Sequence, residues 1–436
     1  MFPKPIPKHA LLLQGPNGPF FRRYARDLQA RGIRVTKINF SPSDSLFFRG
    51  DNAISYRGTL ADWPDYFRDY VVGEEVDAVI LFGDCRPIHI AITTTCQELN
   101  ITTWVFEEGY IRPDYVTLER NGVNGNSQLP RDPNFYREIT KSIQPQRKPP
   151  QSIGATFRYS ALWAIINGWV NTLFGWRYPH YCHHRDIRPL VQGLVWIRGG
   201  LRKVYYQRKE RSLVDRFTAE WSGNYFFVPL QVHNDSQVSH SDFTGVPEFI
   251  RYVVEQFATY ITDNTDDDTE NRIKTRLVFK HHPRDRPYCD YTDRLDKLAS
   301  EFALDDRIVY VHDLHLPTLL KNARGTIVMN STVGLSSLHH GTPVKALGKA
   351  VYNIPELTHQ GDLIDFFRDP GVVDTELYEA FTSYIRMATQ INGSFDKRLA
   401  HSETACGMKL AEAPDSDIAN AREKAKRRAI TKKRNV

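Results

Sequence analysis

Cysteine is scarce in this chain of 436 residues, and the cysteines that occur follow no framework. There are five, an odd number without any Cys-x-x-Cys pair, at positions 85, 96, 182, 289 and 406. This usage is typical of reduced thiols in a cytoplasmic protein and argues against a disulfide scaffold. Gly and Pro, at 26 and 25 residues, are not enriched enough to indicate a disordered chain.

Long apolar runs are also missing. The N-terminal stretch "MFPKPIPKHALLLQG" lacks the apolar segment and cleavage site of a signal peptide. The uncharged stretch 159–176 has 18 residues and two asparagines, whereas a membrane span needs about 20 mostly apolar residues. On a helix this stretch has one apolar face, formed by Leu162, Ile166, Trp169, Leu173 and Trp176. Such a helix lies in a membrane interface or packs against a sheet, and the sequence leaves both open.

Charge is distributed unevenly along the chain. The net charge is +6, yet residues 141–210 contain 12 Lys and Arg against 2 Asp and Glu, and residues 421–436 contain 8 against 1. The rest of the chain is therefore acidic, and the two basic segments suit a polyanion such as anionic lipid or nucleic acid. Because these residues lie outside the motifs described below and no RNA-recognition signature is visible, we expect a membrane surface and no nucleic acid.

The pattern of elements indicates an α/β fold. Strand-like and helix-like stretches alternate from residue 9 to 109 and again from Tyr225 to 348, which favours two doubly wound, Rossmann-type parallel sheets. We therefore predict an N-terminal domain over 1–140, an aromatic and basic helical segment over 141–220, a second domain over 221–375, and a C-terminal helix with a basic tail over 376–436. Length alone also favours two cores.

Polar side chains gather where the predicted strands end, which is where doubly wound folds bind ligands. They comprise Glu107 and Glu108; Gln231 and Asp235; Lys280, His282 and Arg284; and Asn330, Ser331 and Thr332. Hydroxyls and free N–H groups at a helix start bind phosphate, and a cluster of His, Lys and Arg adds further phosphate ligands. Each residue alone also fits a turn or a helix cap, which is the more common role.

The acids fit a sugar transfer. A retaining double displacement needs a carboxylate nucleophile and a group that manages the acceptor proton, and an inverting transfer needs only the base. Asp235 and the Glu107/Glu108 pair end strands in different halves, so we expect them to face one central cleft between the domains. No cluster of carboxylates has the spacing of a metal site, so neither a metal nor a cofactor is expected.

Four stretches together resemble one family. "FEEGYIRPDYVTLE", "FVPLQVHNDSQV", "KHHPRD" and "NSTVGLSSLHHGTPV" are similar, in this order, to the KpsS/LipB-type capsule polysaccharide proteins of Gram-negative bacteria, which are related to KpsC. The match spans about residues 9 to 395. It implies a GT-B-like β-Kdo transferase that moves the first Kdo from CMP-β-Kdo to (lyso)phosphatidylglycerol, starting the poly-Kdo linker of a capsule glycolipid.

The resemblance also implies roles for the motif residues. Asp235, in a Gln-x-x-x-Asp motif with Gln231, is expected to be the nucleophile, and Glu108 or Glu107 the base. His282, Ser331 and Thr332 would hold the CMP phosphate, with Lys280, Arg284 and Asn330 beside them. Expected partners are CMP-Kdo, the acceptor lipid, the anionic inner-membrane surface, a KpsC-type transferase and the export machinery.

The expected location is cytoplasmic, peripheral on the inner face of the inner membrane. A non-catalytic export or scaffold protein is the alternative, although it leaves the clustered acids unexplained.

Overall fold

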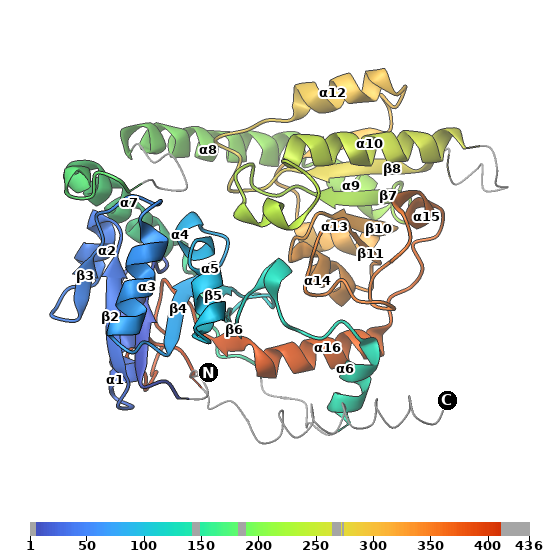
Figure 1. Ribbon diagram of the computed structural model, residues 1–436. Helices are drawn as coiled ribbons and strands as arrows, with labels where there is room; N and C mark the ends of the chain where they lie inside the picture. Colours follow the sequence, from blue (N-terminus) through green and yellow to red (C-terminus); the bar gives the residue numbers. More distant parts are fainter. Residues whose placement is uncertain (1–5, 142–148, 182–188, 264–271, 273, 411–436) are drawn as a thin grey trace. The chain divides into compact units, whose positions relative to one another are not determined.

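The computed structural model describes residues 6–141, 149–181, 189–263, 272 and 274–410. Within them the chain forms two compact units, each with its own sheet (Figure 1). Residues up to 130, 134–189 and those from 380 onward belong to the first unit, and residues 131–133 and 190–379 to the second. The predicted basic tail at 421–436 lies outside the described residues.

The sheet of the first unit has seven strands in the order β12-β6-β5-β4-β1-β2-β3. Its strands are β1 (His9–Leu12), β2 (Arg34–Asn39), β3 (Ala53–Ser55), β4 (Ala78–Phe82), β5 (Thr102–Glu108), β6 (Tyr115–Arg120) and β12 (Gln390–Asn392). The first five are parallel, in the order of a doubly wound sheet whose switch point lies between β1 and β4. The antiparallel strands β6 and β12 extend its edge and were not predicted.

Alternate residues of these strands build the two layers of the first unit. In β1, Ala10 and Leu12 pack with α1 (Phe20–Gln29), whereas Leu11, together with Leu13 just after the strand, packs with α3 (Trp63–Gly73) on the other face. Strands buried on both faces are expected to be mainly apolar, as β1 and β4 are. Between β4 and β5 the chain forms two short helices, α4 (Pro87–Ile90) and α5 (Thr93–Glu98).

The second sheet is parallel throughout, in the order β11-β10-β7-β8-β9. Its strands are β7 (Tyr225–Pro229), β8 (Arg276–Lys280), β9 (Ile308–Val311), β10 (Gly325–Val328) and β11 (Val344–Ala346). Counted along the chain this is again the doubly wound order, with its switch point between β7 and β10. The predicted fold class, α/β with two doubly wound sheets, is confirmed.

Helices cover both faces of this sheet. Phe226 and Val228 of β7 pack with α10 (Val246–Thr262), α12 (Thr292–Glu301) and α15 (Leu363–Arg368). Tyr225 and Phe227 pack on the opposite face with α9 (Leu213–Thr218) and α13 (Leu316–Asn322). The apolar positions of α10 recur every three or four residues, and this face is the buried one.

The remaining helices revise two predicted boundaries. They are α2 (Pro42–Phe47), α6 (Pro133–Thr140), α7 (Phe157–Phe174), α8 (Pro189–Lys209), α14 (Val333–His339) and α16 (Thr375–Ala388). The segment predicted over 141–220 is divided, because α7 packs on α2 of the first unit whereas α8 belongs to the second. Within the C-terminal part predicted over 376–436, the described residues 380–410 belong to the first unit, where β12 pairs with β6.

Candidate active site

The switch point of the second sheet brings two of the predicted motifs together. Because β7 and β10 are neighbouring parallel strands, the loops that follow them start side by side at the carboxyl edge of the sheet. The first loop contains Gln231 and Asp235, and the second contains Asn330. This juxtaposition lies within one unit.

Gln231 links the two loops. Its side chain is buried, and its Nε2 donates to Asn330 Oδ1 at 2.9 Å and to Asp235 Oδ2 at 3.3 Å. Asn330 in turn donates through Nδ2 to the carbonyl of Gln237 at 2.7 Å. The Oε1 atom of Gln231 is buried and has no hydrogen-bond partner among the described residues. Since an unpaired buried acceptor is costly, this oxygen marks a place where a ligand donor would be favoured.

Asp235 is half-buried and both of its oxygens are directed by neighbours. Oδ1 accepts the backbone N–H of Gln237 at 3.0 Å and thereby caps the short helix η3 (Ser236–His240), while Oδ2 faces the Gln231 amide. The cap that the sequence offered as the ordinary role of this acid is therefore present. It also holds the carboxylate in one orientation, which a nucleophile requires.

A His–Asp pair that sequence reasoning did not assign joins the same loop to the one after β8. The Asp285 carboxylate is fully buried and accepts both the backbone N–H of His233 at 2.7 Å and its ring Nδ1 at 2.5 Å. Both residues stand inside the quoted motifs "QVHND" and "HHPRD", so their presence there was the available signal. The pair fixes the loop of Asp235 against the loop of His282.

This pair also belongs to a group of possible metal ligands. His233, Asp285 and Cys289 place donor atoms within 4.8 Å of one another. The ring of His233 already uses Nδ1 on Asp285, and burial raises the pKa of the Cys289 thiol, which disfavours the thiolate that metals bind. The arrangement is better explained as a hydrogen-bonded loop contact, and the absence of a metal stays a prediction.

The three basic residues at the end of β8 and in the loop that follows it occupy different environments. Lys280 is buried and donates to the carbonyl of His312 at 3.1 Å, and burial lowers the pKa of its ammonium. His282 is half-buried, and its Nδ1 accepts the backbone N–H of Arg284 at 3.1 Å, which leaves the proton of the neutral ring on Nε2. Arg284 is exposed. Among them, His282 has the geometry of a donor to an anionic ligand, whereas Lys280 is turned to the protein.

The hydroxyl motif after β10 is arranged around a tyrosine. Ser331 and Thr332 are half-buried. Ser331 Oγ accepts the N–H of Val333 at 3.3 Å, whereas Thr332, the N-cap residue of α14, makes no side-chain cap bond. The hydroxyl of Tyr352 donates to the carbonyl of Ser331. A Cβ on Gly334 would lie 2.2 Å from that hydroxyl oxygen, which explains why glycine stands there. Because α14 has only seven residues, its dipole is short and the side chains carry more of any anion binding.

Glu107 and Glu108 end β5 in the first unit. The strand continues through Glu108, so the two side chains point to opposite faces of the sheet. The two carboxylates therefore cannot both face the same substrate. Glu107 is half-buried and its Oε1 accepts the N–H of Glu108 at 2.9 Å, whereas Glu108 is exposed. Burial, reinforced by the charges of Glu108 and Asp84, raises the pKa of Glu107 to about 7. Of the pair, Glu107 has the properties of a general base at neutral pH.

The glycine that follows the two acids is required by the backbone. A Cβ on Gly109 would lie 2.3 Å from the carbonyl oxygen of Tyr115, in the strand that pairs with β5. The acid-acid-Gly motif therefore has a structural role as well, because its glycine allows β5 and β6 to approach each other closely. The motif loops of the second unit thus lie together at one hydrogen-bonded edge of its sheet. Glu107 and Glu108 belong to the first unit.

Buried polar groups also anchor α8 to the strand ends of the second sheet. The carboxylate of Glu210, next after α8, accepts the backbone N–H groups of His312 at 2.7 Å and Asp313 at 2.9 Å. The ring of Tyr206 stacks on the ring of His312 with centroids 3.5 Å apart. These contacts, none of them foreseen from the sequence, fix the C-terminal end of α8.

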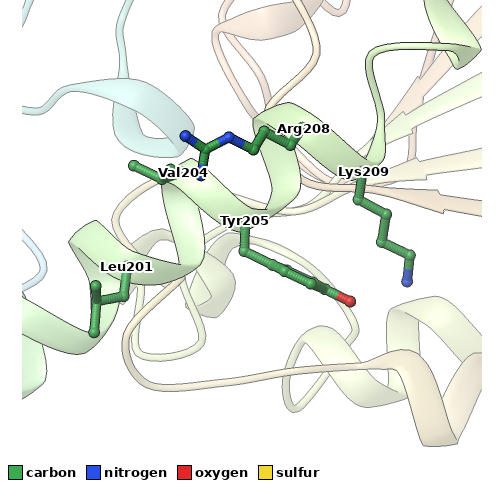
Figure 2. Close-up of a pocket in the computed structure, with 5 residues that line it drawn as sticks. All are labelled: Leu201, Val204, Tyr205, Arg208 and Lys209. Carbon is green, nitrogen blue, oxygen red and sulfur yellow. The ribbon is translucent and has the colours of Figure 1, made fainter.

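The anchored helix carries a shallow hollow on its outer side. Figure 2 shows its lining, in which Tyr205 and Lys209 extend to the same side and the guanidinium of Arg208 lies near Val204. Leu201 completes the set, so the hollow is formed by one face of α8 with three- and four-residue spacing. Its residues are apolar and basic and include none of the predicted site residues, so it is a surface feature distinct from the motif edge.

Comparison with known proteins agrees with the motifs. Residues 77–396 match the family model described as capsule polysaccharide biosynthesis protein. The chain is 34% identical over 389 residues to the capsule polysaccharide export protein KpsS of Escherichia coli, covering 89% of this chain and 97% of that protein.

It is also 37% identical over 394 residues to the capsule polysaccharide modification protein LipB of Neisseria meningitidis serogroup A, covering 89% and 91%. Among solved structures, the β-Kdo 2,7 transferase KpsC of Thermosulfurimonas dismutans aligns over 88% of this chain and 93% of its own, with 12% identity and a TM-score of 0.40.

Proposed function

Because the chain belongs to the capsule polysaccharide biosynthesis protein family, we propose that it is a retaining β-Kdo glycosyltransferase. It transfers the first Kdo from CMP-β-Kdo to phosphatidylglycerol or its lyso form, and so starts the poly-Kdo linker of a capsule glycolipid. Membership in the family supports capsule biosynthesis, and the Gln-x-x-x-Asp motif supports Kdo as the sugar.

One observation carries the proposal: a carboxylate, an amide and a hydroxyl motif converge on the switch point between β7 and β10. Gln231 bonds to both Asp235 and Asn330 and keeps one buried acceptor unpaired. Doubly wound sheets bind nucleotides at this edge, and a carboxylate there can reach the reacting carbon of a bound nucleotide sugar. A purely structural turn would not need a buried amide with an unpaired oxygen.

In the first step Asp235 acts as nucleophile. A carboxylate oxygen bonds to the anomeric carbon of Kdo while the bond from that carbon to the phosphate oxygen of CMP breaks, and CMP leaves with the electron pair. His282 donates from Nε2 to the leaving phosphate, and Ser331 and Thr332 add hydroxyl donors. The attacking group is a carboxylate oxygen, so this step involves no proton transfer.

In the second step the acceptor hydroxyl displaces Asp235. Its oxygen bonds to the anomeric carbon, the glycosyl ester breaks, and the hydroxyl proton goes to Glu107. A carboxyl with a pKa of about 7 suits this step, since it is ionised in a good part of the molecules at neutral pH and still binds a proton well. Two inversions give net retention. We prefer Glu107 to Glu108 because Glu108 is exposed and points to the other face.

The acceptor's lipid nature sets the location. We propose that the protein works in the cytoplasm as a peripheral protein on the inner face of the inner membrane, where it meets the anionic lipid phosphatidylglycerol. A KpsC-type transferase would extend its product, and the export machinery would take the finished chain. The donor is a substrate, and no cofactor or nucleic acid is part of the proposal.

Incubation with CMP-Kdo and a short-chain phosphatidylglycerol, followed by mass spectrometry, tests this function. We expect the lipid to gain the mass of one Kdo, and the anomeric configuration of the product, read by NMR, to be retained. Parallel reactions with lyso and diacyl acceptors identify the preferred form. Release of CMP without a glycolipid, or a product of inverted configuration, would contradict the mechanism. A fully inert but folded protein would favour the non-catalytic role in capsule export.

A further inference from the structure

Helix α7 packs in the reverse of the usual orientation. Its buried residues are Asn167 and Gly168, on the polar side of the helix. Asn167 accepts a hydrogen bond from the hydroxyl of Ser43, and Asn171 Oδ1 accepts the backbone N–H of Ser43 at 2.9 Å. The amphipathic helices of globular proteins ordinarily bury the apolar side. Here the small and polar side is attached to α2.

The turn after α7 is held in the same way. The hydroxyl of Tyr178 donates to Ser55 Oγ at 2.8 Å and also bonds Ser45, and the hydroxyl of Tyr181 accepts from Gln14 at 2.7 Å. The helix and its turn are thus fixed to the first unit by named hydrogen bonds. The orientation is specified by the sequence and does not depend on loose packing.

The opposite side of α7 is an exposed apolar face. The side chains on this side with large exposed fractions are Leu162 (47%), Ile165 (48%), Trp169 (42%) and Leu173 (59%), and Trp176 (77%) follows in the short helix η2 (Gly175–Arg177). Ile166, which the helical pattern placed in this face, is only half-exposed, and Ile165 takes its place. Contiguous exposed apolar residues of this number mark an interaction surface.

The charges within the segment that carries this face are of one sign. Arg158 and Arg177 stand at its two ends, and residues 149–181 contain no Asp or Glu. Lys397 adds a third cation, with its Nζ 6.0 Å from the ring centroid of Tyr159. Tryptophan and tyrosine beside cations are typical of segments that lie at the headgroup level of a bilayer. Anionic headgroups complement such a rim.

We propose that α7 docks in the plane of an anionic lipid bilayer, with Leu162, Trp169, Leu173 and Trp176 entering the headgroup and acyl boundary. None of the helices in the described part of the chain is long and apolar enough to cross a membrane. The polar face held by Ser43 keeps α7 parallel to the surface of its own unit. Docking in this way would place the first unit at the surface where a lipid acceptor lies. That last consequence rests on the proposed function, whereas the docking itself does not.

Vesicle flotation with the full chain tests the docking. The wild type is mixed with vesicles of phosphatidylcholine alone or with phosphatidylglycerol, without any donor sugar. We expect it to float with the anionic vesicles and to float less as salt rises. The variant Trp169→Glu/Leu173→Glu should lose roughly tenfold or more of its apparent partition coefficient. Because both side chains are exposed, its thermal midpoint should stay within a few degrees of the wild type.

Two control variants make the outcome specific. Leu60→Glu/Val372→Glu adds the same charge at exposed apolar positions elsewhere and should float like the wild type. Ile197→Glu/Leu201→Glu adds it on the exposed face of α8 and should retain most of the binding. Equal loss in all variants, loss only in the α8 variant, or no flotation of the wild type would overturn the proposal.

A change of oligomeric state or a large loss of stability in the α7 variant would instead assign the face to a protein contact. Transfer to a soluble short-chain acceptor, measured separately, shows whether the proposed activity stands when docking fails.

Discussion

The two regions that carry the sequence motifs are built differently. At the carboxyl edge of the second sheet, side chains from the loops after β7, β8 and β10 bond to one another through the Gln231–Asn330 and His233–Asp285 contacts. At the end of β5 in the first unit, Glu107 accepts a hydrogen bond from the backbone N–H of its neighbour Glu108, in an environment that raises its pKa to about 7.

This difference separates two kinds of chemical work. A network in which each group is held by another keeps a substrate in one position, since its atoms cannot move independently. A half-buried acid with a raised pKa changes its protonation state near neutral pH, which suits proton transfer. We therefore expect substitutions in the second unit to act on donor handling, and substitutions at Glu107 to change the pH dependence.

The largest effect is expected for Asp235→Asn. Removal of the nucleophile should lower the transfer rate by about a thousandfold or more. The fold should persist, because asparagine is also a good cap for η3. CMP release and product mass give the rate, and a thermal melt checks folding. Asp242→Asn, an exposed acid on the same loop, is the matched control and should transfer normally. If the Asp235→Asn protein folds and transfers the sugar at an undiminished rate, the double-displacement mechanism is wrong.

The next effect is expected for Glu107→Gln. If Glu107 is the base, the wild-type rate should rise as pH increases through about 7, and the variant should lose about a hundredfold in rate and that rise together. Glu108→Gln, the neighbouring exposed acid, should keep the rise but move it to slightly lower pH, because a charge that raises the pKa of Glu107 is removed. A profile whose rise near pH 7 survives in Glu107→Gln would assign that proton to another group.

The same residue predicts a stability change with a definite sign. Its pKa is raised from 4.5 to about 7 on folding, so its contribution to stability is full below pH 4.5 and is lost as pH rises through about 7. Glu107→Gln should therefore gain about 1 to 3 kcal/mol relative to the wild type between pH 4 and pH 8, measured by denaturant unfolding. A constant difference across this range would show that the carboxyl is solvated.

A smaller effect on rate is expected for Asp285→Asn. The buried carboxylate accepts two hydrogen bonds from His233, and an amide can accept only at its oxygen. We expect about 1 to 3 kcal/mol less stability and a roughly tenfold lower rate, because the loop of Asp235 loses its attachment to the loop of His282. Urea unfolding and steady-state kinetics measure both. Asp293→Asn, on the exposed start of α12, is the control. If the two variants behave alike, the His233–Asp285 pair has no positioning role.

The sequence predicted the sheets well and the site in part. Alternation of apolar strands and amphipathic helices identified both doubly wound sheets, because burial on two faces demands apolar strands. The motif loops were correctly placed at strand ends. The antiparallel strands β6 and β12 were missed, since β12 is three residues long and comes from a distant segment. The expectation that both acids face one cleft did not take alternation into account, because Glu107 and Glu108 are both in β5 and point to opposite faces.

Two other features depend on contacts that no local pattern shows. The His233–Asp285 pair joins residues 52 positions apart, and its members look like ordinary loop residues until the strands align. The pattern of α7 predicts two faces but does not say which one packs. Small residues at 167 and 168 let the helix approach α2 closely, and its asparagines find partners at Ser43. In α10 the apolar face is the buried one, because it packs into the hydrophobic core of the second unit.

The smallest effect is expected for Gly334→Ala. This variant tests whether Ser331 and Thr332 act together with the hydrogen-bonded loops at the carboxyl edge of the second sheet. The added methyl would meet the hydroxyl of Tyr352, and Tyr352 holds the carbonyl of Ser331, so the strain should pass to the proposed phosphate ligands. Since the nucleophile is untouched, the KM for CMP-Kdo should rise about threefold to tenfold with little change in kcat. Ser336→Ala, exposed on the same helix, should change neither constant. A lower kcat at unchanged KM would instead place this motif in the transition state alone.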